Sequence, residues 1–117
     1  MSYDIRIIHN GAICEVDEKH HISGGTYVFG GTDLLELNIT YNYSPFFCAT
    51  LGEDGIRSIY GKSIADTLPI LERAAAQLIG DPDRDYWAAT EGNARKALLD
   101  LIALAKMAPP EAVWEGD

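Results

Sequence analysis

The stretch Leu-Leu-Glu-Leu-Asn-Ile-Thr-Tyr-Asn-Tyr-Ser, residues 34–44, decides the fold of this chain, because its side chains alternate between apolar and polar. A period of two is typical of a β-strand that buries one face. The polar face carries mainly neutral amides and hydroxyls, which both donate and accept hydrogen bonds, so it suits a specific partner better than bulk water. The expected buried face comprises Leu35, Leu37, Ile39, Tyr41 and Tyr43, and the expected polar face comprises Glu36, Asn38, Thr40, Asn42 and Ser44.

The length and composition indicate one globular domain that spans residues 1–117. Of the 117 residues, 47% are hydrophobic and 23% are charged, as in ordinary soluble proteins. No apolar run approaches the roughly 20 residues that a membrane-spanning helix needs. The N-terminal residues lack the basic and apolar blocks of a signal peptide. We therefore expect a cytoplasmic protein with no membrane partner.

The net charge of −9 argues against direct binding to nucleic acid, because an acidic chain repels polyanions. Two explanations of the charge remain open. It keeps the protein soluble, or it mimics a nucleic acid on a basic host protein. The two cysteines, Cys14 and Cys48, belong to no recognisable motif, and we expect both to be buried as small hydrophobic residues.

The N-terminal part of the chain is expected to form an antiparallel sheet. Tyr3 to His9 predicts a first strand, and Asn10-Gly11 is a strong hairpin signal because both residues tolerate a positive φ. Ala12 to Val16 would return as a second strand, and Asp17 to Ser23 would form a polar connection. Two glycine turns would then flank a short strand at Tyr27-Val28-Phe29. Turn geometry explains these glycine pairs better than a phosphate cradle, because neither pair precedes a helix.

The C-terminal part is expected to be helical. Ser44-Pro45 predicts the start of a short helix that ends near Leu51. Ser63 would cap a longer helix, in which Pro69 either introduces a kink or delays the start, and Thr90 would cap the last helix. The sequence therefore predicts an α+β fold, in which an N-terminal antiparallel β-sheet packs against two or three C-terminal helices as a two-layer sandwich. The expected bounds are 3–43 for the strands, 44–108 for the helices, 83–89 for a helical turn among them, and 112–114 for a short terminal strand.

The sequence shows no motif typical of a catalytic site. A nucleophilic pair of Cys48 with a histidine would lack a third, orienting group. His20 and His21 are adjacent, so on an extended segment they point to opposite sides and seldom bind one metal ion. A solvated acidic loop explains Asp17, Glu18 and these histidines more simply. We therefore expect no catalytic residue, no metal and no cofactor.

Three polar clusters instead predict a binding site. They supply aromatic rings, amides and two cations, and the third cluster lies near a helix N-terminus, which favours an anion. One interpretation is a pocket for a nucleotide-like ligand, with Arg57 and Lys62 neutralising its phosphate. The other is that the same side chains brace loops and cap helices. The clusters are Asn38, Thr40 and Asn42 on the expected strand, Arg57, Tyr60 and Lys62 after the short helix, and Tyr86, Trp87, Thr90 and Asn93 around the start of the last helix.

Several segments of the chain resemble a group of small uncharacterised phage and prophage proteins of gut-type bacteria. They include Asn-Ile-Thr-Tyr-Asn-Tyr-Ser-Pro at 38–45, Gly-Ile-Arg-Ser-Ile-Tyr-Gly-Lys at 55–62 and Asp-Tyr-Trp-Ala-Ala-Thr-Glu-Gly-Asn-Ala at 85–94. The resemblance covers most of the chain from residue 24 onward and carries over no functional residue. It implies a viral accessory protein that works in a bacterial cytoplasm.

This origin makes binding the expected activity, since small phage proteins without catalytic motifs often act on a host component. We expect a non-enzymatic counter-defence factor that sequesters a small nucleotide-like immune signal, as a homo-oligomer. An acidic inhibitor that docks directly on a basic host defence protein is the alternative. A nucleotide-processing enzyme is the third hypothesis. The first two hypotheses are built partly on analogy with other small phage proteins.

Overall fold

Strand β1 (Ser2–His9) is the central strand of the main sheet. It pairs antiparallel with β5 (Glu36–Thr40) on one edge and with β6 (Val113–Gly116) on the other. The register places Asp4 directly opposite Asn38. The strand expected at 112–114 is therefore present, but it begins one residue later and ends two residues later than predicted.

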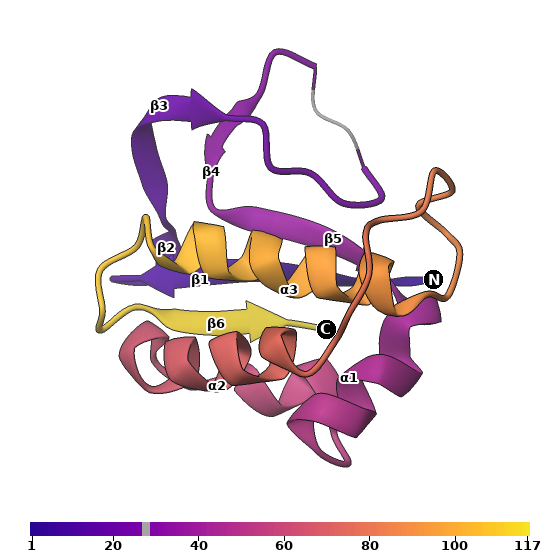
Figure 1. Ribbon diagram of the computed structural model, residues 1–117. Helices are drawn as coiled ribbons and strands as arrows, with labels where there is room; N and C mark the ends of the chain where they lie inside the picture. The colour runs from indigo at the N-terminus through magenta and orange to yellow at the C-terminus, as the bar shows by residue number, and fades with distance from the viewer. Residues whose placement is uncertain (27–28) are drawn as a thin grey trace.

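The structure of the protein, a computed structural model, describes residues 1–26 and 29–117. Most of the short strand expected at 27–29 therefore lies outside the described residues. An antiparallel sheet, built mainly from the N-terminal part, packs against helices from the C-terminal part (Figure 1). This arrangement confirms the predicted α+β fold. Within the described part of the chain, no helix has the length and apolar character needed to cross a bilayer.

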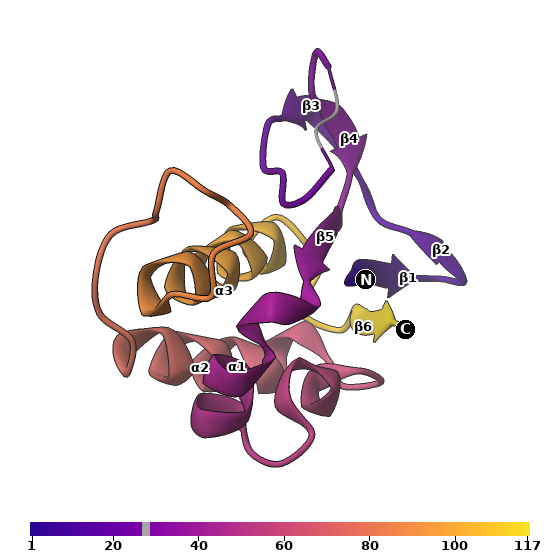
Figure 2. The same ribbon diagram turned by 90° about the vertical axis from the view of Figure 1, so that its right-hand side faces the viewer.

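Asn10-Gly11 forms the predicted hairpin turn between β1 and β2 (Ala12–Ile13). Both residues have a positive φ, 53° and 80°, as a type I′ turn requires. The chain then leaves the main sheet, and β3 (Glu15–His20) pairs with β4 (Thr32–Leu34) in a separate two-stranded ribbon (Figures 1 and 2). The polar connection predicted from residue 17 is therefore wrong as far as residue 20, because β4 supplies a strand partner that the local sequence does not reveal.

The alternating stretch is a strand only as far as Thr40. Residues Tyr41–Tyr43 form a 3₁₀-helix, η1, and α1 (Ser44–Leu51) follows directly. The hydroxyl of Thr40 accepts a hydrogen bond from the backbone N–H of Asn42 at 3.2 Å, so it caps the turn that ends the strand. The prediction of a continuous strand to residue 43 is therefore wrong. Ser44 is also not the predicted cap, because it is itself helical.

Helices α2 (Ile64–Ala76) and α3 (Glu91–Ala105) begin at the caps that the sequence predicts. The hydroxyls of Ser63 and Thr90 each accept a hydrogen bond at 3.1 Å from the backbone N–H three residues later. Pro69 lies within α2 and does not delay its start. The segment expected as a helical turn, 83–89, contains one hydrogen-bonded turn and no helix. The remaining connection is a 3₁₀-helix, η2 (Gly55–Ile59), between α1 and α2.

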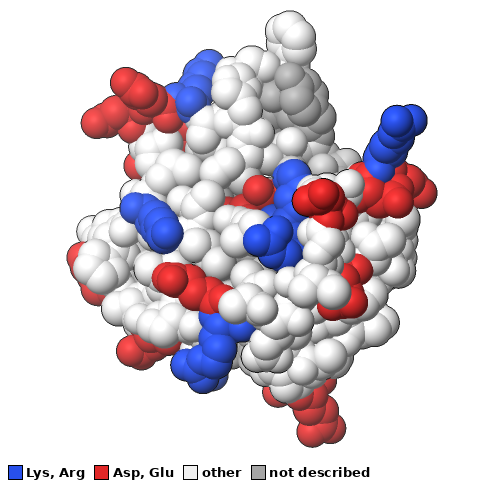
Figure 3. Space-filling model, in the orientation of Figure 1, with Lys and Arg blue, Asp and Glu red and all other residues white. Residues whose placement is uncertain are grey.

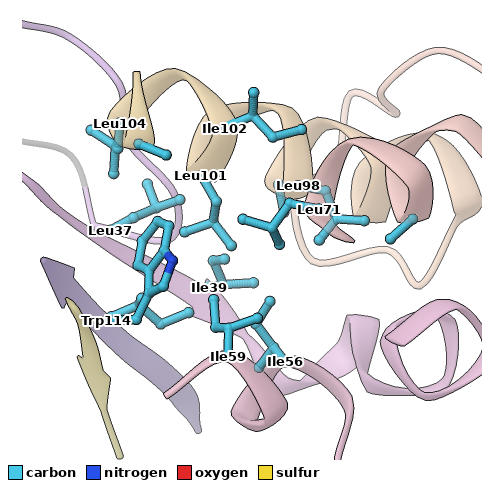
Figure 4. Close-up of a cluster of buried hydrophobic side chains, with 14 of the residues drawn as sticks. Leu37, Ile39, Ile56, Ile59, Leu71, Leu98, Leu101, Ile102, Leu104 and Trp114 are labelled. Atoms are coloured by element: carbon cyan, nitrogen blue, oxygen red, sulfur yellow. The ribbon is translucent and has the colours of Figure 1, made fainter. Parts of the chain in front are cut away.

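The helices cover one face of the main sheet and complete the hydrophobic core (Figure 4). Trp114 of β6 is buried there, and its indole N–H donates to the hydroxyl of Thr67 on α2 at 2.7 Å. Among the described residues, no helix covers the opposite face of the sheet (Figure 2). The core side chains include Leu37 and Ile39 of β5, Ile56 and Ile59 of η2, Leu71 of α2, and Leu98, Leu101, Ile102 and Leu104 of α3.

Candidate functional site

Two cavities lie beside β5, and Gly24 and Leu37 line both of them. The sheet-face cavity, of about 260 Å³, lies between the outer face of the main sheet and the segment 22–26. The α3 cavity, of about 160 Å³, lies between β5, α3 and the segment 82–86. The sheet-face cavity is lined by Asp4, Arg6, Thr26, Thr32, Glu36 and Asn38, and the α3 cavity by Ile39, Arg84, Tyr86, Asn93, Lys96 and Asp100, among others.

The wall that α3 contributes to the α3 cavity repeats with helical spacing. Asn93, Lys96, Ala97 and Asp100 all line the cavity, and this spacing places them on one face of the helix. Strand β5 contributes apolar surface from Leu37 on another side. The cavity therefore combines apolar walls with a short row of polar groups, as small-molecule sites do.

Lys96 and Asp100 form an ion pair in the α3 cavity, with 2.8 Å between Nζ and Oδ2. The side chain of Asp100 is only 20% exposed. Burial raises the pKa of Asp100 above its ordinary value, and the ammonium group of Lys96 offsets only part of that rise. Arg84 and Asp83 line the same cavity, so its charged groups are two cations and two carboxylates.

Asn93 holds the segment 82–89 over the α3 cavity. Its side chain is buried, and its Oδ1 accepts a hydrogen bond from the backbone N–H of Asp83 at 2.8 Å. Its Nδ2 donates to the carbonyl oxygens of Asp85 and Ala88, at 2.9 Å each. Because the amide is occupied by the protein's own backbone, Asn93 shapes the cavity rather than offering free hydrogen-bonding groups to a ligand.

Tyr86 closes the α3 cavity on the side of β5. Its hydroxyl donates to the carbonyl oxygen of Asn38 at 3.2 Å and accepts from the backbone N–H of Thr40 at 3.1 Å. These bonds satisfy backbone groups on the outer edge of β5. Burial is the main cause of the raised pKa of Tyr86, so its hydroxyl stays protonated at neutral pH. The ring of Tyr43 meets that of Tyr86 edge to face, and the Tyr43 hydroxyl donates to the Tyr86 carbonyl oxygen.

Three of the predicted site residues line a cavity: Tyr86 and Asn93 line the α3 cavity, and Asn38 lines the sheet-face cavity. The Nδ2 of Asn38 donates to Ser2 Oγ at 2.8 Å and to Asp4 Oδ1 at 2.5 Å. Both partners belong to β1, so this amide nitrogen joins two strands of the sheet. The interpretation as internal bracing therefore describes Asn38 better than the interpretation as a free ligand-binding amide.

The other four residues of the first and third clusters line neither cavity. Thr40 and Thr90 act as caps. Asn42 donates from Nδ2 to the carbonyl oxygen of Trp87 at 2.8 Å, and the side chain of Trp87 is half exposed. The polar face expected for one long strand does not form a continuous surface, because the chain turns after Thr40.

Arg57, Tyr60 and Lys62 lie next to β6 and line neither cavity. The guanidinium carbon of Arg57 lies 5.1 Å from the ring centroid of Tyr3 and 5.6 Å from that of Tyr41, a cation–π arrangement. The hydroxyl of Tyr60 is buried with no hydrogen-bond partner among the described residues. The backbone of Lys62 pairs with β6, and its side chain is exposed. The two cations predicted to neutralise a phosphate, Arg57 and Lys62, therefore border neither the sheet-face cavity nor the α3 cavity.

The charge of the α3 cavity comes partly from residues that the sequence did not predict, Arg84, Lys96 and Asp100. One signal was present in the sequence. Asp100 lies between the buried residues Leu98 and Leu101 on α3, four residues after Lys96, so an ion pair beside an apolar stripe could have been expected. Asp100 lies on the same cavity as β5 only because of tertiary packing, which the neighbouring sequence does not reveal.

Gly24 and Gly25 have a role other than the predicted turn geometry, because neither has a positive φ. A Cβ atom on Gly24 would lie 1.7 Å from the carbonyl oxygen of Asn38, so glycine is required for close approach to β5. The backbone N–H of Gly25 donates to that same oxygen at 3.0 Å. Gly30 and Gly31, in contrast, have φ values of 79° and 83°, as the predicted turn requires.

The surface on the α3 side of the molecule shows Lys and Arg side chains interspersed with Asp and Glu (Figure 3). This face offers no continuous basic track for a polyanion. Among the described residues, no three His, Cys, Asp or Glu side chains gather as metal ligands would. The expectation that both cysteines are buried is wrong for Cys48, which is exposed, and only partly met by Cys14, which is half-buried against the core.

Comparisons with protein-family models, with curated proteins and with solved structures find no match for this chain.

Proposed function

We propose that this chain is a non-enzymatic phage protein that sequesters a small nucleotide-like molecule in the bacterial cytoplasm. The observation that carries the proposal is the α3 cavity, in which apolar walls meet a few charged groups. The heterocycle of the ligand would lie between Leu37 of β5 and Ala97 of α3. Tyr43 and Tyr86 would supply aromatic surface beside it.

The size of the α3 cavity limits the part of the ligand that it can enclose. Its volume of about 160 Å³ is close to the roughly 150 Å³ of an engineered cavity that holds benzene. It is well below the roughly 300 Å³ at which sites begin to enclose drug-sized ligands. The cavity therefore suits a single heterocycle, and the sugar and phosphate of a nucleotide would remain at its mouth.

Arg84 and Lys96 support an anionic group on the ligand. Both line the cavity and both are exposed, so either can reach a phosphate at the mouth. Asp83 and Asp100 balance these two cations. Fit to the cavity, and not charge alone, would therefore decide which anion binds.

Thermal unfolding in the presence of nucleotides tests the proposal. A ligand that binds only the folded state stabilises it by about 2.7 kcal/mol at 100 times its Kd, so the melting temperature should rise with ligand concentration. Arg84→Gln should reduce this rise. The matched control, Arg73→Gln, changes an exposed arginine of α2 that lines neither cavity and should leave it unchanged. The proposal fails if no mononucleotide, cyclic nucleotide or cyclic dinucleotide raises the melting temperature.

The state of the recovered ligand distinguishes sequestration from catalysis. Ligand released unchanged after denaturation supports sequestration, whereas a chemically altered product supports the nucleotide-processing enzyme. No cysteine or histidine of the described residues lines the α3 cavity, so the cavity lacks the usual nucleophile and base pairs. Mass spectrometry of the released molecule gives the answer.

The open face of the main sheet favours a second candidate, an acidic inhibitor of a basic host defence protein. Asp4, Glu36 and Glu115 alternate along their strands with buried residues and so belong to this face. Arg6 belongs to the same face and lies opposite Glu36 and Glu115 in the strand register, and it forms an ion pair with Glu115, with 2.8 Å between Nε and Oε1. Such a surface would speed association with a basic partner, and salt would weaken that effect.

A charge-reversal pair tests this second candidate. Glu36→Lys should abolish a salt-sensitive complex in a pull-down with the basic host protein. Glu72→Lys, an exposed acid on α2, makes the same change of charge elsewhere and should preserve the complex. Equal loss in both variants would mean that only the net charge matters and that this face is not the docking surface.

A further inference from the structure

Asp100 offers a hydrogen-bond acceptor to the α3 cavity that the protein itself leaves free. Its Oδ2 accepts from Lys96 Nζ at 2.8 Å, and its Oδ1 has no hydrogen-bond partner among the described residues. The carboxylate is mostly buried, yet it lines the cavity. An ionised carboxylate accepts hydrogen bonds at both oxygens and donates none, so it selects for donors.

The uncharged polar side chains in the cavity are already occupied. The amide of Asn93 bonds the backbone of the segment 82–89, and the hydroxyl of Tyr86 bonds the backbone of β5. Leu37, Ile39 and Ala97 present only apolar surface. Charged groups therefore supply the hydrogen-bonding capacity that is left. Asp83 and Arg84 belong to the segment 82–86, whereas the Lys96–Asp100 pair of α3 presents an ammonium donor directly next to a carboxylate acceptor.

We infer that Asp100 determines the ligand specificity of the α3 cavity, and that the preferred heterocycle carries two adjacent N–H donors beside a carbonyl acceptor, as guanine does. The inference rests on the proposed function. The N1–H and exocyclic amino group of guanine would donate to the two oxygens of Asp100, while Lys96 would donate to the guanine carbonyl oxygen. Adenine presents a ring-nitrogen acceptor where guanine presents N1–H, and two facing acceptors repel. A mismatched base leaves a buried carboxylate without its partner.

Calorimetric titration with guanosine, inosine and adenosine monophosphates tests this inference. We expect guanosine monophosphate to bind most tightly. Inosine monophosphate lacks the exocyclic amino group and should bind about tenfold more weakly, the cost of one hydrogen bond to a charged group. Adenosine monophosphate should bind more weakly still. Asp100→Asn should lower the affinity for guanosine monophosphate by at least about tenfold and remove the preference over adenosine monophosphate.

Asp66→Asn is the matched control, because Asp66 is an exposed acid on α2 that lines neither cavity. It should leave the order of affinities unchanged. Equal binding of the three nucleotides to the unaltered protein would overturn the inference and leave the proposed function standing. If Asp100→Asn still preferred guanosine monophosphate, the inference would likewise be overturned and the proposed function would stand. Absence of binding by all three nucleotides, and by their cyclic forms, would overturn both.

Discussion

The side-chain oxygen of Asn93 accepts a hydrogen bond from the backbone N–H of Asp83 at 2.8 Å, which ties the first turn of α3 to the segment that precedes it. The same side chain donates to two carbonyl oxygens further along that segment. The turn is thereby held across the α3 cavity without a helix of its own. A residue expected from the sequence to contact a ligand instead builds the wall beside it.

Asn93→Ala should lower the free energy of unfolding by about 2–3 kcal/mol, because it leaves several backbone groups without partners at a buried position. Asn42→Ala is the matched control. Asn42 is exposed and makes one side-chain bond to the same segment, at 2.8 Å, so its loss should cost about 0.5–1 kcal/mol. Urea unfolding monitored by circular dichroism measures both. Equal costs would show that Asn93 does not hold the segment.

Gly24→Ala should destabilise the protein by about 1–3 kcal/mol, since a Cβ atom cannot fit against the Asn38 carbonyl oxygen without backbone movement. Gly24 lines both cavities, so the same variant should also weaken nucleotide binding. Ser23→Ala changes the neighbouring residue without adding bulk. If Gly24→Ala unfolds at the same denaturant concentration as Ser23→Ala, the close approach to β5 is not required.

Trp114 and Thr67 should be energetically coupled by about 1 kcal/mol, because the indole N–H donates to the threonine hydroxyl inside the core. A double-mutant cycle with Trp114→Phe and Thr67→Val measures this coupling from four unfolding curves. Each single variant should be destabilised by more than the coupling energy. Trp114→Phe also leaves unfilled space in the core, and Thr67→Val also removes the bond that the Thr67 hydroxyl donates to the Ser63 carbonyl oxygen at 2.8 Å. A coupling energy near zero would mean that the bond contributes nothing to linking β6 with α2.

Asp100 should make stability depend on pH in a defined direction. Burial raises its pKa in the folded state, so between the unfolded and folded pKa values the native protein binds more protons than the unfolded chain. Its contribution to stability is therefore lost as pH rises through that range. Asp100→Asn removes this loss, and the variant should gain stability relative to the unaltered protein between about pH 3 and about pH 7.

Urea unfolding of both proteins at the two pH values checks this prediction. Other carboxyl groups titrate equally in both proteins, so their effects cancel in the difference. A difference in unfolding free energy that stays constant, or falls as the pH rises, would contradict a raised pKa for Asp100. A constant difference would mean that the ion pair with Lys96 cancels the effect of burial on the pKa of Asp100, and a falling difference would mean that it outweighs that effect.

Local signals in the sequence predicted those parts of the fold that short-range chemistry determines. The hairpin at Asn10-Gly11 follows from two residues that tolerate a positive φ, and the starts of α2 and α3 follow from the hydroxyls of Ser63 and Thr90. The strand β3 has no such signal, because its acidic residues become a strand only through pairing with β4. The alternation of apolar and polar residues at 34–44 correctly predicted a strand as far as Thr40. There the Thr40 side chain caps a 3₁₀-helix and the strand ends.

The candidate site was harder to predict, because its parts meet only in the folded chain. Tyr86 and Asn93 were named from the sequence and do line the α3 cavity, although their polar atoms contact the protein's own backbone. Lys96 and Asp100 were not named. On an isolated helix they would be an ordinary exposed ion pair, and only packing against β5 and the segment 82–86 buries the carboxylate.

The most direct test of the account is a titration of the ¹⁵N-labelled protein with guanosine monophosphate, followed by amide chemical shifts. Binding in the α3 cavity should produce saturable changes at the residues around it, Tyr86, Lys96 and Asp100. The amide signals of Arg57 and Lys62, next to β6, should stay in place. Changes confined to those two residues, or no change anywhere, would contradict it.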